Sequence, residues 1–338
     1  MERRELSEFE RDEPLGVGSV GTVYRAHELT SGRIVALKLL LPSVSSDPAI
    51  RSRFRREMLV LEKLCHPNIV GYFGGGEHEG QLFFAMEFLE GASLEDMLEG
   101  EKRLPWPDVV ECGWHICSAL QYAHNQGVIH RDLKPSNLFF SSGGVLKLCD
   151  FGIALDTGES DLTNAGLTVG THRYMAPELI RGEVASPRTD LYALGCVLYR
   201  MLVGRAPFGG SNFAEIFEQH LHQAPRSLQT ILGKAPEELD ELLMELLEKK
   251  PEDRPVNARA VQGRLAEIHL RWQESQYGEV RWNPAAPSER SGAGLLAGLP
   301  DRTLPAEPER VVRASSPLRL LAVLVGVLAL GVAAWWVS

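Results

Sequence analysis

Short runs of β-branched and aliphatic residues dominate the beginning of the chain. Residues 20–25 and 34–40 form two such runs, separated by the turn-like segment 30–32, and residues 81–86 form a third. Their composition and length predict strands. Residues 49–64 lie between the second and third runs and carry apolar residues at helical spacing. These residues are Phe54, Met58, Leu61 and Leu64. The pattern predicts a small strand-rich part that contains one helix.

After residue 105 the apolar residues recur with the period of helices. One stripe consists of Val109, Gly113, Ile116, Leu120 and Ala123, and a later one of Leu239, Leu242, Leu243, Leu246 and Leu247. Stripes of this kind are the core faces of helices and carry no chemistry. A small strand-rich part therefore precedes a larger helical part, and a cleft between two such parts is a usual ligand site.

The hydrophobic pattern fades after about residue 270. Residues 275–317 are rich in Pro, Ala, Gly, Ser and Arg, and such a segment buries too little apolar surface to offset its ordering entropy, so we expect a disordered linker. Residues 320–337 contain no charged residue. About 18 residues at ~1.5 Å each span roughly 27 Å, enough to cross a hydrocarbon core. We expect a single C-terminal transmembrane helix there; the alternative is a buried helix or strand.

The residues around this apolar segment predict its orientation. Three arginines precede it and no cation follows it, so the positive-inside rule predicts that the preceding part of the chain faces the cytoplasm. Trp335 and Trp336 fit an interfacial aromatic belt. The N-terminal residues 1–5 are charged and lack an apolar stretch, so they do not form a signal peptide.

Composition refines this picture only slightly. Hydrophobic residues make up 44% and charged residues 24% of the chain, which are ordinary values for a folded protein. The formal net charge of -10 repels phosphate backbones, and this argues against nucleic acid as a main partner. The five cysteines fall in apolar stretches without the paired spacing of a zinc site, which predicts reduced thiols in the core.

The first chemical signal lies at the start of the first predicted strand, residues 20–25. Gly16, Gly18 and Gly21 allow the backbone to approach phosphates because no Cβ intervenes. By itself this pattern is compatible with a plain glycine turn or with a dinucleotide site. A dinucleotide site needs a helix after the glycines, whereas a strand follows here. The context favours a glycine-rich flap over phosphates.

Four further signals follow in a fixed order. Lys38 lies in the predicted strand 34–40, where a lone lysine is usually solvated, but Glu57 on the next helix offers it a partner. The segment 130–137, His-Arg-Asp-Leu-Lys-Pro-Ser-Asn, combines a base, cations and an amide in one loop. Asp-Phe-Gly at 150–152 and Ala-Pro-Glu at 176–178 complete the set.

With these motifs, residues 9–270 resemble the eukaryotic-type, or Hanks-type, serine/threonine protein kinases, and in particular bacterial membrane-anchored members. The resemblance implies an α+β, two-lobed protein kinase fold with a small β-rich N-lobe and a larger, mainly helical C-lobe. It implies ATP and Mg²⁺ as cofactors, with Mn²⁺ as the alternative ion. It also implies protein substrates, transfer to Ser and Thr, and a location at the bacterial cell membrane.

The resemblance also implies roles for individual residues. Asp132 is the implied catalytic base, Lys134 the residue that touches the γ-phosphate, and Thr171 a partner of both. Asn137 and Asp150 are the implied metal ligands. The implied nucleotide-binding residues are Gly16, Val17, Gly18, Gly21, Val23, Ala36, Lys38, Glu57, Met86, Glu87, Leu89 and Phe139.

Supporting residues match as well. Glu57 is implied to orient Lys38, and Asp190 to steady the catalytic loop. Leu61, His130 and Phe151 are implied to form a stack that links the two lobes. Glu178 and Arg254 are implied to form an ion pair that braces the larger lobe. Two positions depart from the family pattern. Phe139 replaces a smaller residue beneath adenine, and His172 replaces a common proline near the substrate groove.

Regulation is implied by the residue before the base. Arg131 is expected to bind a phosphate on the activation loop, since a guanidinium fork suits phosphate. The loop hydroxyls are those of Thr157, Ser160, Thr163, Thr168 and Thr171. Phosphorylation in trans would require a dimer. Two rival functions are a membrane-tethered pseudokinase docking module and a small-molecule kinase. The presence of Lys38, Asp132, Asn137 and Asp150 argues against the first, and the Ala-Pro-Glu segment argues against the second.

Overall fold

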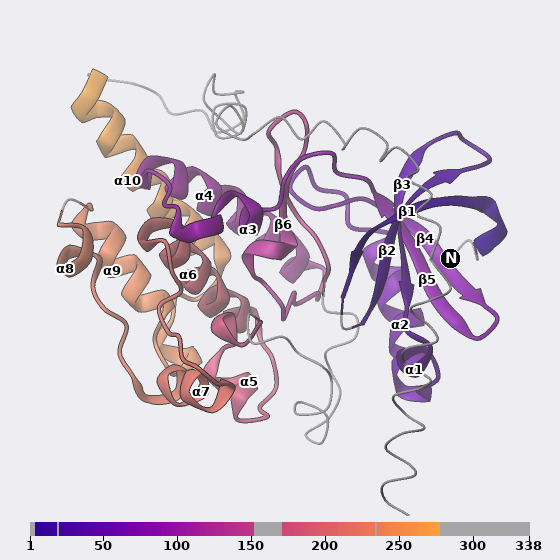
Figure 1. Ribbon diagram of the computed structural model, residues 1–338. Coiled ribbons are helices and arrows are strands. Elements are labelled where there is room, and N and C mark those ends of the chain that lie inside the picture. The colour runs from indigo at the N-terminus through magenta and orange to yellow at the C-terminus, as the bar shows by residue number, and fades with distance from the viewer. Residues whose placement is uncertain (1–3, 19, 152–170, 234, 278–338) are drawn as a thin grey trace, which may run out of the picture. The chain divides into compact units, whose positions relative to one another are not determined.

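The computed structural model of this 338-residue chain describes residues 4–18, 20–151, 171–233 and 235–277 (Figure 1). All of them belong to the first of two units, Met1–Gly298, whereas the second unit, Leu299–Ser338, lies outside the described residues. Nearly all of the predicted linker and the whole apolar segment 320–337 therefore also lie outside them. Among the described helices, none has both the length and the apolar character needed to span a membrane.

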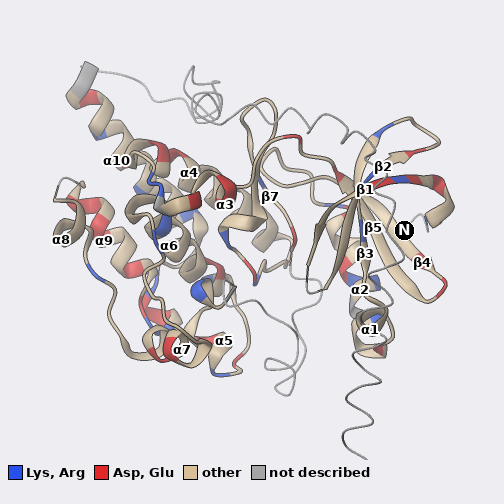
Figure 2. Ribbon diagram, in the orientation of Figure 1, with Lys and Arg blue, Asp and Glu red and all other residues tan. Residues whose placement is uncertain are grey.

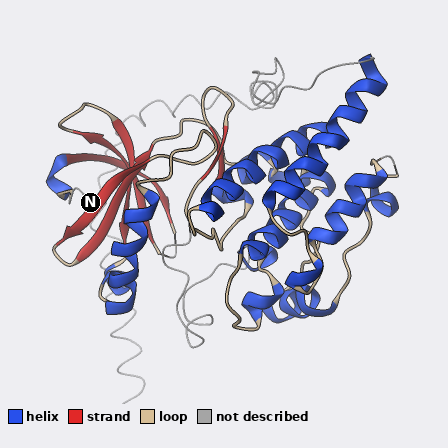
Figure 3. Cartoon of the chain, turned by 180° about the vertical axis from the view of Figure 1, so that it is seen from behind, coloured by secondary structure: helices blue, strands red, loops and turns tan. Residues whose placement is uncertain are grey.

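The first lobe is built on a five-stranded antiparallel sheet with the strand order β1-β2-β3-β5-β4 (Figure 3). The strands are β1 (Phe9–Val17), β2 (Gly21–Glu28), β3 (Ile34–Leu40), β4 (Tyr72–His78) and β5 (Gln81–Glu87). The predicted strands at 20–25, 34–40 and 81–86 correspond to β2, β3 and β5. The apolar centre of this sheet contains Val35 and Leu37 of β3 with Phe83 and Ala85 of β5, all fully buried.

Two helices accompany the sheet: α1 (Pro42–Ser45) and α2 (Pro48–Leu61). The sequence starts α2 with two local signals, because the Asp47 carboxylate accepts from the Ala49 amide at 2.7 Å and a proline occupies the first turn. The predicted apolar stripe of this helix is buried, with Phe54, Met58 and Leu61 between 0% and 2% exposed.

The second lobe is mainly helical. Its helices are α3 (Leu94–Met97), α4 (Trp106–Asn125), α5 (Pro177–Ile180), α6 (Pro187–Val203), α7 (Phe213–His222), α8 (Leu228–Leu232), α9 (Glu237–Leu246) and α10 (Ala258–Tyr277). A two-stranded sheet, β6 (Leu138–Phe140) and β7 (Leu146–Leu148), lies between α4 and the remaining helices in sequence. Five 3₁₀ turns complete the described elements: η1 (Leu6–Glu8), η2 (Glu99–Glu101), η3 (Pro135–Asn137), η4 (Thr171–Tyr174) and η5 (Pro251–Asp253).

Helix α6 forms the centre of this lobe. Ser186 caps its N-terminus, and Gly204 ends it with φ 88°, a left-handed conformation that glycine adopts without strain. Between these ends, 14 of its 17 residues are buried. Both stripes predicted from the sequence, one on α4 and one on and just after α9, are buried too. Acidic residues lie at the exposed starts of α3 and α9 (Figure 2).

Three features of the structure correct the sequence picture. Strands β1, β4, β6 and β7 were not evident, because β1 is largely exposed and β4 carries three glycines, so neither shows a clear hydrophobic alternation. Helix α10 extends to Tyr277, past the predicted start of the linker at residue 275. Finally, the prediction of core thiols is correct for four cysteines and wrong for Cys65, which is exposed in the loop after α2.

Candidate active site

The glycine-rich segment joins β1 to β2, as expected for a flap. The register of the sheet places Gly16 opposite Val23, and Val23 opposite Lys38 of β3. A Cβ at Gly16 would meet nothing within 4 Å, whereas a Cβ at Gly21 would lie 2.2 Å from the Leu39 carbonyl oxygen. Gly21 is therefore required by the packing of β2 on β3. The fold does not require Gly16, and the open space beside it is compatible with a bound phosphate.

The other predicted nucleotide residues lie on the neighbouring strands. Ala36 of β3 pairs with Met86 of β5 across the sheet, and both are buried. Phe139 lies on β6 and is partly buried. The Glu87 carboxylate accepts from the Lys147 ammonium at 2.8 Å and from the Gly71 amide at 3.0 Å, which leaves the main chain after β5 to contact adenine. The adenine contacts themselves remain predictions.

Lys38 has a different partner from the one that the sequence suggested. Its ammonium donates to Oδ2 of Asp150 at 2.8 Å. The Glu57 carboxylate of α2, which was expected to hold Lys38, instead lies 3.8 Å from the Arg131 guanidinium. Among the described residues, Lys38 therefore forms its ion pair with Asp150 and not with Glu57. The reason is geometric, because the position of α2 decides which cation its carboxylate can reach.

Asp150 has the properties of a metal ligand. Its burial opposes ionisation, but the charge and the hydrogen bond of Lys38 outweigh this effect and hold the pKa of Asp150 below its usual value. While Oδ2 accepts from Lys38, Oδ1 is buried without a hydrogen-bond partner among the described atoms. The residue adopts φ 52°, and such left-handed strain clusters at functional sites.

Asn137 completes the expected metal pair. Its amide nitrogen donates to the Asp132 main-chain oxygen at 2.7 Å and to the Asp132 carboxylate at 3.1 Å, so its side-chain oxygen remains for a cation. Its main-chain oxygen accepts from the Cys149 amide at 2.9 Å, which ties it to the residue before Asp150. Carboxylate and amide oxygens are the ligands that Mg²⁺ prefers. The side chains of Asn137 and Asp150 therefore fit a magnesium site.

The catalytic loop brings the predicted base and its lysine together. The Lys134 ammonium donates to Oδ2 of Asp132 at 2.7 Å, and both side chains are mostly shielded from solvent. The Asp132 carboxylate and the Lys134 ammonium are therefore in direct contact, as the roles predicted for them require. Thr171, the third predicted catalytic residue, begins η4, but its side chain lies outside the described part of the chain, so its role remains a prediction.

Asp190 of α6 holds the main chain of the catalytic loop, as the sequence implied. Its carboxylate accepts from the main-chain amides of His130 at 2.9 Å and Arg131 at 2.8 Å. These bonds fix Arg131 in a left-handed conformation with φ 66°. A further partner was missed. His124, at the end of α4, lies 2.7 Å from the same carboxylate and is buried. Its only sequence signal is a polar residue at the end of an apolar helix.

The contact of His130 with Phe151 and the pair of Glu178 with Arg254 are confirmed, whereas for Leu61 the structure shows burial. The ring centroids of His130 and Phe151 lie 4.7 Å apart, and both residues are buried, as is Leu61. Arg254 donates two parallel hydrogen bonds to Glu178, at 2.7 and 2.8 Å. Burial opposes ionisation of Glu178, but the bonds and charge of Arg254 lower its pKa below the ordinary value.

The divergent His172 is also accounted for in part. It is buried, and its ring packs edge-on against Phe217 of α7 with a centroid distance of 5.2 Å. Helix α7 thereby supports the segment before Ala-Pro-Glu. The activation-loop hydroxyls of Thr157, Ser160, Thr163 and Thr168 lie outside the described residues, so the sequence prediction of a phosphorylation site there is unchanged.

Comparison with known proteins supports the assignment. The family model of the protein kinase domain matches residues 9–265. Serine/threonine-protein kinase PknB of Mycolicibacterium smegmatis is 35% identical over 268 residues, which cover 77% of this chain and 43% of the relative. PknB of Mycobacterium leprae is 34% identical over 266 residues, with the same coverage. The chain thus spans less than half the length of these curated relatives.

Solved structures agree on the fold. The crystal structure of the Mycobacterium tuberculosis PknI kinase domain matches with a TM-score of 0.64 and 28% identity, and the match covers 78% of this chain and 97% of that one. The two-lobed α+β fold predicted from the sequence is therefore confirmed.

Proposed function

The chain belongs to the protein kinase family, and from this premise we propose that the protein transfers the γ-phosphate of ATP to serine and threonine hydroxyls of proteins. One observation carries the proposal. Lys134 and Asn137 both donate to the Asp132 carboxylate, in a loop whose main chain is fixed by Asp190. A lysine two residues after the base is the form of this loop typical of kinases that act on serine and threonine.

The geometry suggests a role for each side chain. Asp132 orients the substrate hydroxyl and accepts its proton as the oxygen bonds to the γ-phosphorus and the bond to ADP breaks. Lys134 orients the Asp132 carboxylate through its hydrogen bond and offers positive charge to the transferring phosphoryl group. When bound by Asn137 and Asp150, Mg²⁺, or Mn²⁺ as the alternative ion, neutralises phosphate oxygens. Loose phosphoryl transfer needs mainly such positioning and charge.

Lys38 must change its partner for this arrangement to work. It now donates to Oδ2 of Asp150, whereas phosphate binding requires its ammonium to face the nucleotide. A move of Glu57 from Arg131 toward Lys38 would provide the pair that the family pattern implies. We therefore assign the described arrangement to a form that precedes full assembly of the site.

The central test uses the full-length chain with ATP and Mg²⁺, followed by mass spectrometry of phosphorylated residues. We expect phosphoserine and phosphothreonine in the wild type. The variant Asp132→Asn should lower the rate about 10²- to 10⁴-fold, because general-base catalysis contributes that much. Asp253→Asn, which alters an exposed carboxylate of η5, serves as the matched control and should retain full activity.

The rival functions give different results in the same experiment. A pseudokinase docking module predicts no phosphoprotein from the wild type. A small-molecule kinase predicts ATP consumption without phosphorylated protein. Wild-type activity in Asp132→Asn would show that another residue is the base.

The location of the protein is a separate proposal. It rests on the uncharged segment 320–337 and on Arg310, Arg313 and Arg319 before it. We infer a single-pass anchor in the bacterial cell membrane that leaves the catalytic lobes in the cytoplasm. Phosphorylation in trans between two anchored copies is part of the same proposal, because an anchor raises the local concentration of both.

A further inference from the structure

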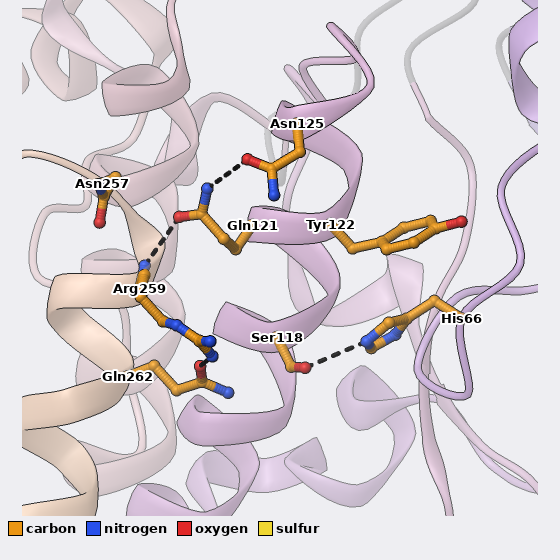
Figure 4. A pocket seen from close by; sticks show the side chains of 8 residues that line it. All are labelled: His66, Ser118, Gln121, Tyr122, Asn125, Asn257, Arg259 and Gln262. Atoms are coloured by element: carbon orange, nitrogen blue, oxygen red, sulfur yellow. Dashed lines mark hydrogen bonds between the residues drawn. The ribbon is translucent and has the colours of Figure 1, made fainter.

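A pocket of about 440 Å³ lies outside the candidate active site. Its walls are α4, the first turns of α10 and the loop that follows α2, represented by His66 (Figure 4). None of the active-site residues discussed above lines it. The loop of His66 connects to the site through Asn68, which is hydrogen-bonded to Leu146 and Leu148 of β7. The pocket therefore joins the loop after α2 to the helical lobe.

The hydrogen bonds within the pocket engage the side-chain amide oxygens of its glutamines and asparagines. Oε1 of Gln121 accepts from the Arg259 amide at 2.9 Å, which fixes the orientation of this side chain. Nε2 of Gln121 then donates to Oδ1 of Asn125 at 2.8 Å (Figure 4). Oδ1 of Asn257 accepts from the Ala260 amide at 2.9 Å. The oxygens of the two asparagines are thus engaged, and their NH₂ groups remain as donors.

The hydroxyl groups of Ser118 and Tyr122 also remain available as hydrogen-bond donors to a ligand. Nδ1 of His66 accepts from the Asn68 amide at 3.1 Å, so its proton lies on Nε2 and is donated to Ser118 Oγ at 3.1 Å. Burial, and secondarily the charge of Lys147, lower the pKa of His66, which keeps it neutral. The Tyr122 hydroxyl accepts from the Cys65 amide at 3.2 Å. Both hydroxyls therefore keep their own O–H for a ligand.

One full positive charge accompanies these donors. The exposed Arg259 side chain donates to Oε1 of Gln262 at 3.1 Å and forms no ion pair with a described residue. None of the described Asp or Glu residues lines the pocket, although the chain contains 45 acidic residues and has a net charge of -10. A surface that offers several unused donors and one cation favours a ligand that is rich in acceptors and carries a negative charge.

We propose that this pocket binds an acidic peptide segment of a partner protein, with one Asp or Glu carboxylate on Arg259 and backbone carbonyls on the asparagine amides and hydroxyls. A guanidinium fork matches a planar carboxylate. The remaining donors are neutral. Ser118, Tyr122 and Asn125 are spread along α4 and Asn257 lies just before α10, so a peptide can offer successive carbonyls to them. A free phosphate dianion would leave most of these donors unused and would find only one cation.

The test measures binding by the full-length chain in detergent, with fluorescein-labelled hexaglutamate as the probe and fluorescence anisotropy as the readout. A saturating non-hydrolysable ATP analogue with Mg²⁺ blocks the active site. Arg259→Gln should weaken binding about tenfold, as expected for loss of a hydrogen-bonded charge. Asn125→Ala should weaken it a few-fold. The matched control is Arg264→Gln on the same helix, whose arginine pairs with Glu245 outside the pocket, and it should bind normally.

The remaining outcomes decide against the proposal. Equal binding of labelled hexaglutamine would show that the carboxylate is not recognised. Hexaglutamate binding that is the same in Arg259→Gln and in wild type would place the probe elsewhere. Displacement of the probe by equimolar inorganic phosphate would indicate a small-anion site. Because the readout is binding, a failure of the proposed kinase activity would not affect the result.

Discussion

At the scale of single residues, the chemistry of the site depends on charged groups that have buried partners. Asp190 holds the main chain of the catalytic loop, and Lys134 holds the base. Removing one partner of such a pair lowers the free energy of unfolding by more than forming the pair raises it, because the other group stays buried without its hydrogen bond.

The glycines of the flap separate a folding role from a binding role. Gly21→Ala should lower the free energy of unfolding by about 1–3 kcal/mol, because the new Cβ overlaps the backbone of β3. Gly16→Ala should leave stability unchanged and raise the KM for ATP, since its Cβ would enter the space over the phosphates. Urea denaturation and initial rates measure the two effects. Equal destabilisation by both substitutions would contradict the division.

The buried pair of Glu178 and Arg254 should respond to mutation and to pH. Arg254→Met leaves the buried Glu178 carboxylate without its cation, although it still accepts from the Thr189 hydroxyl. The variant should cost about 3–5 kcal/mol in unfolding free energy, whereas the double variant Glu178→Leu with Arg254→Met should recover most of it. The pKa of Glu178 is lowered from 4.5 in the folded state. Its contribution to stability is therefore complete above pH 4.5 and is lost as the pH falls toward the lower folded pKa. Urea titrations from neutral to acidic pH measure this loss of unfolding free energy. An equally large loss at acidic pH in the double variant would contradict the assignment to Glu178.

At the scale of elements, the position of α2 determines the state of the site. Its Glu57 lies near Arg131, and the Lys38 ammonium lies on Asp150. A phosphate on the activation loop would compete with Glu57 for Arg131, because a phosphate carries more charge than a carboxylate and accepts more hydrogen bonds. Release of Glu57 would allow it to pair with Lys38 and would free Asp150 for the metal.

This exchange predicts that loop phosphorylation raises activity. The double variant Thr163→Ala with Thr168→Ala should phosphorylate a peptide substrate about 5- to 150-fold more slowly, the range typical of coupling between sites. Ser160→Ala is the control in the same loop and should have little effect. If the double variant and the wild type are equally fast, control through the loop is wrong.

At the scale of the whole molecule, a folded catalytic unit is followed by a segment of different composition. The relatives extend well beyond the part that this chain matches, so catalytic likeness says nothing about attachment or substrates. The strongest sequence feature outside the catalytic unit is the uncharged segment 320–337.

Deletion tests the anchor more sharply than point mutation. Full-length protein should require detergent, whereas a chain ending at Pro317 should be soluble and equally active on a peptide, because the intervening segment separates anchor from catalysis. Burial of a side chain contributes about 1.5–3 kcal/mol for each large apolar residue, so one substitution would change little. Fractionation and peptide assays give the answer. Full-length protein that stays soluble without detergent would end the anchor hypothesis, and loss of activity on truncation would mean that the segment supports the fold.

The sequence by itself predicted which residues carry chemistry, through motifs that resemble those of protein kinases, and it determined where several of the elements lie. Strand β3 and helix α2 follow local patterns, and the motifs that contain Lys38, Asp132, Asn137 and Asp150 predict the candidate site. Local patterns suffice for these features because strand and helix periods act over a few residues.

Only the tertiary structure decided which charged groups are paired. Lys38 and Asp150 are 112 residues apart in sequence, and the side chains of His124 and Asp190 are 66 residues apart. Whether such groups meet depends on how helices and lobes pack, and a carboxylate such as Glu57 looks the same in the sequence whichever cation it faces. The donor-rich pocket has the same origin. Its side chains come from three segments that are distant in sequence. They offer hydrogen-bond donors to a ligand because their oxygens accept hydrogen bonds within the fold.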